Sequence, residues 1–188
     1  MIKLIKSRTI LGIDPGTNLL GFGIVRVDEA SKPHFVDMGV LDLRKLESPY
    51  DKLQTIFDKV DALCNIHCPD DLAIESPFYG KNAQVIFKLG RAQGASMAAA
   101  LKHGVRIFEY APRKAKMAIC GNGAASKEQV SLIVQKTLGI DIEYKHLDAT
   151  DALALAMCHF YQLTSPLTSC DASTSWEKFV AANPDRIK

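Results

Sequence analysis

The sequence has few of the features that mark membrane proteins or disulfide-stabilised secreted proteins. Its N-terminal apolar stretch is short and is interrupted by Asp14, and no later stretch reaches the length of a membrane-spanning helix. Its five cysteines are odd in number and show no framework spacing, which indicates reduced thiols. We therefore expect a soluble, cytoplasmic protein without a membrane partner.

The sequence also lacks a strong net charge and the length needed for two nucleotide-binding lobes. With a formal charge of +2, any nucleic-acid partner would have to meet a local basic surface, because the global field is weak. A chain of 188 residues can bury one substantial core. We expect one catalytic domain over residues 1–163, followed by a Ser/Thr-rich linker and a short C-terminal tail over residues 164–188.

The order of apolar segments predicts an α/β fold. Three β-branched segments with short connections come first and favour an antiparallel meander, and strands then alternate with helices, which favours parallel additions to the sheet. The predicted strands are 8–14, 21–28, 34–42, 71–75 and 105–110, and the predicted helices are 50–66, 82–102, 126–138 and 147–162. This βββαβαβα order predicts a mixed sheet flanked by helices on both faces, with its ligand site at strand ends.

Four carboxylates stand at telling positions in this pattern. Asp14 closes the first strand, Glu75 closes the fourth, and Asp148 and Asp151 lie three apart where the last helix opens. Taken singly, each has an ordinary structural explanation as a turn former, a solvated strand end or a favourable charge at a helix start. Together they indicate a site for a hard divalent cation such as Mg²⁺, because crowded carboxylates repel one another unless a cation neutralises them.

Several motifs then carry a resemblance to a known family, in order, over about residues 8 to 162. They are Gly12–Thr17, Ala73–Phe78 with Lys81 and Asn82, Lys127–Val130, and Asp148–Ala154. Together they resemble the RuvC family of Holliday junction resolvases. The resemblance implies a ribonuclease H-like fold, a homodimer, and paired nicking of four-way DNA junctions in recombination and repair. It also implies two Mg²⁺ ions per active site, with Mn²⁺ as a substitute, held by the four acids.

The loop after Glu75 is the expected contact to the DNA. Phe78 and Tyr79 could stack on an unpaired base at the centre of a branched junction, followed by Lys81 and Asn82 as DNA contacts. The resemblance places an aromatic wedge at the Phe78 position. The alternative is a hydrophobic contact at the helix entry, in which Phe78 packs into the core.

Basic residues form a second candidate region. They are Arg113, Lys114, Lys116 and Lys127. Ser126 and Gln129 predict a capping box, which puts Lys127 in the first helical turn, where the helix dipole disfavours a cation and a phosphate contact would explain it. From the resemblance we expect Lys116 and Lys127 to be catalytic, and we expect Arg113 and Lys114 to contact DNA. The alternative is a solvated charged face.

Three further features are weaker. Gly90, Gly94 and Ala98 give the helix at 82–102 a small-residue face, which suits either internal packing or a two-fold dimer contact. Cys64, His67 and Cys68 lack a clear fourth zinc ligand, so a buried helix end is the favoured interpretation. For His146 we expect a surface or capping role. The tail with Trp176, Phe179 and Val180 could dock on the domain or on a partner such as the branch-migration helicase with which the family works.

Two other function classes fit part of the sequence. The segment Gly12–Thr17 also resembles the first phosphate loop of actin-like ATPases and sugar kinases, but those enzymes need a second lobe. A non-catalytic nucleic-acid-binding module with the same fold is the other alternative. The presence of all four acids argues against it.

Overall fold

The computed structural model describes residues 7–76, 83–141 and 147–165. The sequence predictions for Phe78, Tyr79, Lys81, Asn82 and His146, and those for the tail beyond residue 165, lie outside these described residues. None of the helices in the described ranges is both long enough and apolar enough to cross a membrane.

Five strands form one mixed sheet in the order β3-β2-β1-β4-β5. The strands are β1 (Arg8–Asp14), β2 (Leu19–Val27), β3 (Pro33–Asp42), β4 (Asp71–Glu75) and β5 (Arg106–Tyr110). The first three pair antiparallel, as the short connections predicted, whereas β4 pairs parallel to β1 and β5 pairs parallel to β4. The mixed sheet of the predicted fold class is therefore confirmed.

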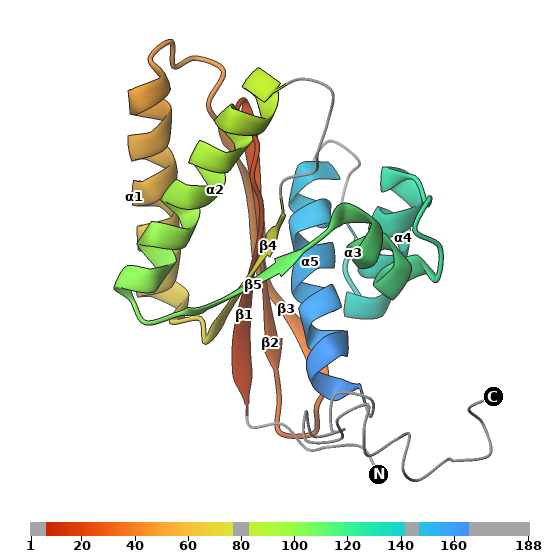
Figure 1. The fold of residues 1–188 in the computed structure, drawn as a ribbon. Helices are drawn as coiled ribbons and strands as arrows, with labels where there is room; N and C mark the ends of the chain where they lie inside the picture. Colours follow the sequence, from red (N-terminus) through yellow and green to blue (C-terminus); the bar gives the residue numbers. More distant parts are fainter. Residues whose placement is uncertain (1–6, 77–82, 142–146, 166–188) are drawn as a thin grey trace, which may run out of the picture.

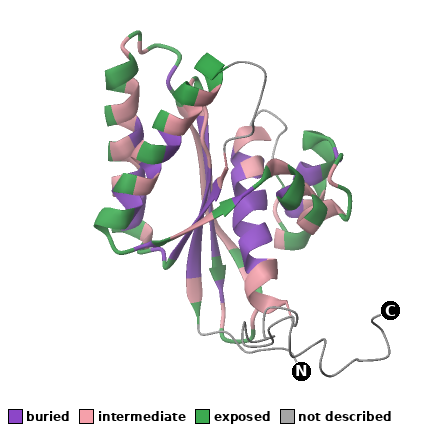
Figure 2. Ribbon diagram, viewed as in Figure 1, coloured by how far each residue is buried: buried purple, intermediate pink, exposed green. Residues whose placement is uncertain are grey.

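Helices cover both faces of this sheet (Figure 1). The helices are α1 (Pro49–His67), α2 (Ala83–Lys102), α3 (Pro112–Cys120), α4 (Lys127–Leu138) and α5 (Leu147–Thr164). Helices α1 and α2 lie on one face, and α5 lies on the other, with α3 and α4 packed beside it (Figure 1). Each face has its own apolar core, and the strand residues between the two layers are largely buried (Figure 2).

Helix α3 was missing from the predicted elements. It begins at Pro112, whose fixed φ suits a first helical position, and it ends at Gly121 in the left-handed conformation. It spans nine residues, and of these only Ala115 is buried. Such a short, mostly exposed helix has too weak an apolar periodicity to be seen in the sequence.

The predicted capping box at the start of α4 is confirmed. The Gln129 backbone N–H donates to Ser126 Oγ at 3.3 Å, and the Ser126 backbone N–H donates to Gln129 Oε1 at 2.9 Å. These two bonds satisfy donors that a helix start otherwise leaves free. They fix the first turn of α4, and with it the position of Lys127.

The candidate zinc ligands Cys64, His67 and Cys68 lie at the C-terminal end of α1. Cys64 is buried in the core, and the Cys68 backbone N–H caps the helix by donating to the Cys64 carbonyl. His67 Nε2 lies 3.6 Å from an oxygen of Asp37. Cys64 is buried but Cys68 is exposed, so this helix end is only partly buried, in contrast to the buried helix end that the sequence predicted.

Helix α5 packs unusually close to the sheet. A Cβ atom added at Gly12 would collide with the backbone carbonyl of Ala152, and one added at Gly21 would collide with that of Asp148. The two glycines therefore let the α5 backbone approach β1 and β2 directly. Because α5 is buried along most of its length (Figure 2), its first turn is held firmly over the end of β1.

Candidate active site

The four predicted acids come from three elements that meet at one end of the sheet. Asp14 ends β1 and Glu75 ends β4, and these strands run parallel with Ile13 paired to Ile74. Side chains alternate along a strand, so Asp14 shares the α5 face with Ile10, whose side chain belongs to the core on that side. The carboxylates of both strand ends therefore project beneath the first turn of α5.

Three of the carboxylates form a compact group. Asp14, Asp148 and Asp151 each present an oxygen atom, and these oxygens lie within 4.8 Å of one another. Glu75 is not a member of this tight group. It lines the same cavity as Asp14 and Asp151, which has a volume of about 210 Å³. The structure thus brings all four acids to one end of the sheet, with Glu75 set apart from the other three.

The pKa values of Asp14, Glu75 and Asp151 are raised above their ordinary range. Burial, reinforced by the charges of Glu75 and Asp151, raises the pKa of Asp14 from 3.8 to about 7. Burial also raises the pKa of Glu75, with Asp151 adding to the effect, and burial raises the pKa of Asp151. The protein therefore holds several carboxylates where their charged forms are disfavoured, which is the pattern expected of a cation site.

Lys127 is the principal counter-charge to the acids. Its Nζ lies 2.6 Å from Asp151 Oδ2 and 3.3 Å from Asp148 Oδ1. Burial opposes the charged form of this lysine, but its hydrogen bond to Asp151 and the surrounding acids outweigh that effect and raise its pKa. The capping box of α4 thus delivers a lysine to the first turn of α5.

The remaining basic residues differ in whether they line the acidic cavity. Lys116 lines the acidic cavity, and its Nζ donates to the Ala125 carbonyl at 2.7 Å, which ties α3 to the residue just before the α4 cap. Lys114 lies over the ring of Tyr110, with 5.2 Å between its Nζ and the ring centroid. Arg113 packs against Gly123. Lys114 and Arg113 are therefore on α3 but do not line the cavity.

The cavity walls include apolar residues that sequence reasoning missed. They are Pro112, Ala115, Val130 and Leu155. Pro112 and Ala115 belong to α3, and because the sequence did not predict this helix, it did not predict that wall of the cavity either. Apolar walls next to clustered acids lower the local dielectric and strengthen every charge interaction in the cavity.

The residues present fit a hard divalent cation. The tight group offers carboxylate oxygens, which are the ligands that Mg²⁺ and Mn²⁺ accept, and it includes no histidine or cysteine. A bound cation would stabilise the charged forms of Asp14, Glu75 and Asp151, whose pKa values burial raises. The cavity is also large enough for water molecules beside such an ion.

An acidic cluster at the ends of β1 and β4, under the first turn of α5, is the arrangement of a ribonuclease H-like nuclease. The structure of RuvC from Thermus thermophilus has the same fold, with a TM-score of 0.73 and 32% identity over 82% of this chain and 95% of that one. The same protein in complex with a Holliday junction substrate gives a TM-score of 0.73 and 30% identity over 83% and 95%.

The family follows from the sequence comparisons. The family model described as crossover junction endodeoxyribonuclease RuvC matches residues 10–159. The crossover junction endodeoxyribonuclease RuvC of Bacteroides fragilis is 49% identical over 190 residues, which cover 100% of both chains. That of Christiangramia forsetii is 50% identical over 188 residues, which cover 99% of this chain and 96% of the relative. The chain belongs to the RuvC family.

Family membership confirms the resemblance seen in the motifs, the ribonuclease H-like fold and the assignment as a hydrolytic nuclease. It does not favour either the ATP-binding lobe or the non-catalytic module. The roles of the individual site residues stay predictions.

Proposed function

We propose that this protein resolves four-way DNA junctions by paired, symmetric nicks during recombination and DNA repair, with Mg²⁺ as the cofactor and Mn²⁺ as a substitute. The observation that carries the proposal is the group of Asp14, Asp148 and Asp151 under α5 in a chain of the RuvC family. A relative with 30% identity and a TM-score of 0.73 has been solved with a Holliday junction substrate.

In this proposal Asp14, Asp148 and Asp151 hold the divalent ions, and Glu75 completes the ligand set from the neighbouring strand. Two such ions would activate the attacking water and stabilise the charge that develops on the scissile phosphate and the leaving oxygen. Asp14, Glu75 and Asp151 line one cavity, and Asp148 lies beside Asp14 and Asp151, so the four carboxylates would fix where the DNA backbone must lie. The apolar walls limit the water around the reacting phosphate.

Lys127 and Lys116 are proposed to act on the phosphate side of the reaction. Lys127 Nζ bridges Asp148 and Asp151, and its third N–H donor can reach a phosphate oxygen. Lys116 is held by the Ala125 carbonyl at the cavity wall. Both cations then oppose the negative charge that builds up in the transition state.

The DNA-contacting residues extend from this centre. We propose that Phe78 and Tyr79 stack on bases at the opened crossover, and that Lys81 and Asn82 contact the DNA beside them. These four residues lie outside the described part of the chain. On α3, Arg113 and Lys114 would contact backbone phosphates next to the active site, which suits their position beside the cavity rather than in it.

We further propose that the protein is a homodimer whose contact includes one face of α2. Two large apolar side chains on this helix, Phe87 and Leu101, are 71% and 59% exposed. Gly94 lies between them and has open space where a Cβ would point, so a second helix can approach closely. Two-fold symmetry would place two active sites on a junction of approximate two-fold symmetry. The cytoplasm and a branch-migration helicase are the proposed setting and partner.

The proposal is tested by cleavage assays on a four-way junction, a linear duplex and an RNA/DNA hybrid of matched sequence, each with Mg²⁺, with Mn²⁺ and with a chelator. We expect metal-dependent nicks at symmetry-related positions of the junction and little cleavage of the other two substrates. Preferred cleavage of the hybrid, or cleavage that survives the chelator, would refute it.

A further inference from the structure

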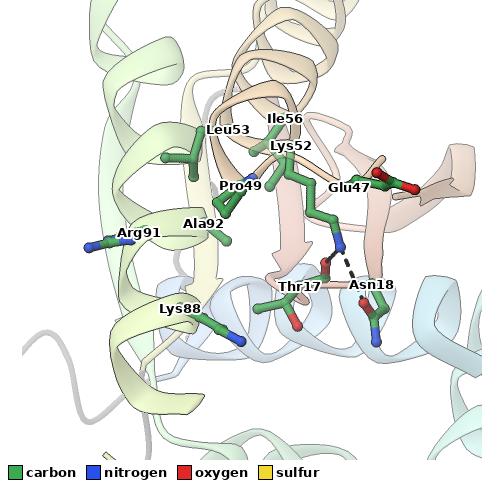
Figure 3. Close-up of a pocket in the computed structure, with 10 residues that line it drawn as sticks. All are labelled: Thr17, Asn18, Glu47, Pro49, Lys52, Leu53, Ile56, Lys88, Arg91 and Ala92. Atoms are coloured by element: carbon green, nitrogen blue, oxygen red, sulfur yellow. Dashed lines mark hydrogen bonds between the residues drawn. The ribbon is translucent and has the colours of Figure 1, made fainter. Parts of the chain in front are cut away.

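A second cavity, of about 200 Å³, lies on the other face of the sheet (Figure 3). Its walls are the first turns of α1, the first half of α2 and the turn between β1 and β2, which contains Thr17 and Asn18. The acidic cavity is instead lined by residues of α3, α4 and α5 and by Asp14 and Glu75 at the ends of β1 and β4. The two cavities are therefore separate, although Thr17 lies only three residues after Asp14 in the chain.

This second cavity has an apolar floor and a polar rim. Leu53, Ile56 and Ala92 supply the floor. Among the described residues, the rim carries the cations Lys52, Lys88 and Arg91 against the acid Glu47. A pocket in which cations outnumber acids in this way favours an anionic ligand.

Lys52 is held in place by the turn between β1 and β2. Its Nζ donates to the Thr17 carbonyl at 3.1 Å and lies 3.4 Å from Asn18 Oδ1 (Figure 3). The lysine therefore bridges α1 to the turn that follows Asp14. Its partners are neutral oxygens, and within the part of the chain that the structure describes its ammonium group forms no ion pair with a carboxylate.

Lys88 approaches the same turn from the other side. Its amino group points toward Thr17, whereas the guanidinium of Arg91 points away from the other rim residues (Figure 3). Within the described ranges, the ammonium group of Lys88 takes part in no ion pair and no hydrogen bond. Thr17 thus turns its carbonyl oxygen to Lys52, while its hydroxyl points away from Lys52 toward the lower part of the view, where the Lys88 amino group also lies (Figure 3).

We propose that this pocket binds one backbone phosphate of the DNA, held by Lys88 and the Thr17 hydroxyl and supported by the charge of Lys52. The inference rests on the proposed function, because the phosphate belongs to a DNA molecule whose other contacts are made at the acidic cavity. A phosphate oxygen suits this set of donors, since ammonium groups and a hydroxyl can all donate to it. One strand would then contact both sides of the β1–β2 turn.

The proposed phosphate site would position the DNA and would take no part in bond cleavage. The β1–β2 turn begins directly after Asp14, so a phosphate fixed at Thr17 ties the DNA to the segment that carries a candidate metal ligand. A backbone contact carries no sequence information, but it sets the register of the DNA on the protein. We therefore expect the pocket to contribute to affinity for every DNA sequence alike.

The test measures binding of a four-way junction to wild type and to Lys88→Gln, in buffer without divalent ions, over a series of salt concentrations. Lys102→Gln is the matched control, since this lysine stands in the last turn of the same helix, away from the cavity. We expect Lys88→Gln to weaken binding about two- to fivefold, as for an exposed charge contact. The slope of log affinity against log salt should become shallower by about 1.

Three outcomes separate the possibilities. Lys88→Arg should restore the wild-type salt slope, and a loss with Lys88→Gln but not with Lys102→Gln supports the pocket. Equal affinity and salt slope for wild type and both glutamine variants overturns it while leaving the proposed function intact. A wild-type protein that does not bind the junction overturns both. Unchanged melting temperatures for the variants show that folding is not the cause.

A second measurement separates DNA from small anions. The backbone amide resonances of Thr17 and Asn18 are followed by NMR while the junction, or inorganic phosphate alone, is added. Shifts caused by the junction at micromolar concentration, and absent in Lys88→Gln, support the proposal. Shifts caused by inorganic phosphate but not by the junction would overturn it, because the pocket would then serve a free anion.

Discussion

Two carboxylates at opposite ends of neighbouring parallel strands, Asp71 and Asp14, show how differently this fold treats buried charge. Asp71 begins β4 and is fully buried, yet it accepts hydrogen bonds from Arg8 at 2.9 Å and from Arg106 at 2.6 and 2.8 Å. Asp14 ends β1 among three other acids, with Lys127 as the nearby cation. The chain itself neutralises Asp71 and leaves Asp14 under-neutralised.

The surroundings of Asp71 extend into a buried polar network. His159 Nε2 lies 3.1 Å from Asp71 Oδ2, and its Nδ1 lies 2.6 Å from the hydroxyl of Tyr110. The imidazole also stacks on Phe108, with ring centroids 4.2 Å apart. Every member has a partner, which is the condition under which a buried polar network supports a unique core. Asp71 therefore has a structural role, whereas the unmet charge of Asp14 calls for a ligand.

The largest expected effect comes from removing charge at the functional carboxylate. Asp14→Asn should lower junction cleavage roughly a thousandfold or more, because stabilisation by divalent ions contributes several kcal/mol to such a reaction. Junction affinity without metal should change little, since cations supply most of it. Single-turnover cleavage and gel-shift titration measure the two quantities. A variant with full cleavage activity would remove Asp14 from the proposed site.

The same chemical change at the structural carboxylate should act on folding. Asp71→Asn leaves a buried His159 and two arginines without their anion, so we expect a loss of about 3 kcal/mol in the free energy of unfolding. Urea denaturation measures it, and Asp58→Asn, at an exposed position of α1, serves as the control. A stability equal to that of the control would show that the network contributes nothing.

The close approach of α5 offers a way to disturb the functional carboxylates without touching them. Gly21→Ala places a methyl group against the Asp148 carbonyl, so the first turn of α5 must move away from β2. We expect a cost of about 1 to 3 kcal/mol in stability, together with weaker Mn²⁺ binding. Gly39→Ala, where the added methyl meets the ring of Phe22 in the core on the other face of the sheet, is the control. Metal binding that matches this control would mean that α5 does not set the ligand geometry.

The smallest effect is a pH dependence of stability in the absence of metal. The folded pKa of Asp14, about 7, lies above its ordinary value of 3.8, so the folded state binds more protons between these two pH values. The contribution of Asp14 to stability is therefore present below about pH 4 and is lost as pH rises to about 7. We expect a loss of about 1 to 3 kcal/mol over this window. Asp14→Asn should flatten the profile, and denaturation curves at several pH values in chelator test it.

These carboxylates also differ in how well the sequence alone predicts their surroundings. Asp14 and Glu75 were recognisable because each closes an apolar run, and both strands have the predicted bounds. The Asp71 network left no comparable signal, since His159 lies 88 residues away in sequence and sits in an apolar helical run. The cavity at Lys52 and Lys88 was missed for the same reason. Its residues come from separate elements that only the folded chain brings together.

Local signals succeeded where the structure depends on neighbours in sequence. Ser126 and Gln129 are three residues apart, so the capping box could be predicted and was confirmed. Helix α3 could not be predicted from a local signal, because a single buried residue gives no apolar periodicity. The placement of Lys127 against Asp148 and Asp151 needed both the local cap and the distant packing of α4 against α5.

The close contacts of Gly12 and Gly21 with α5 link the thermal unfolding of the domain to its catalytic activity. Asp148 and Asp151 stand on a helix whose inner side is part of the main core, and Asp14 stands on the central strand below it. Moving α5 away from β1 would expose that core, so we expect the acids to separate only close to the unfolding of the whole domain. Nuclease activity should accordingly survive warming up to the unfolding transition and vanish with it, rather than fade at lower temperatures as in enzymes whose catalytic groups lie on mobile loops.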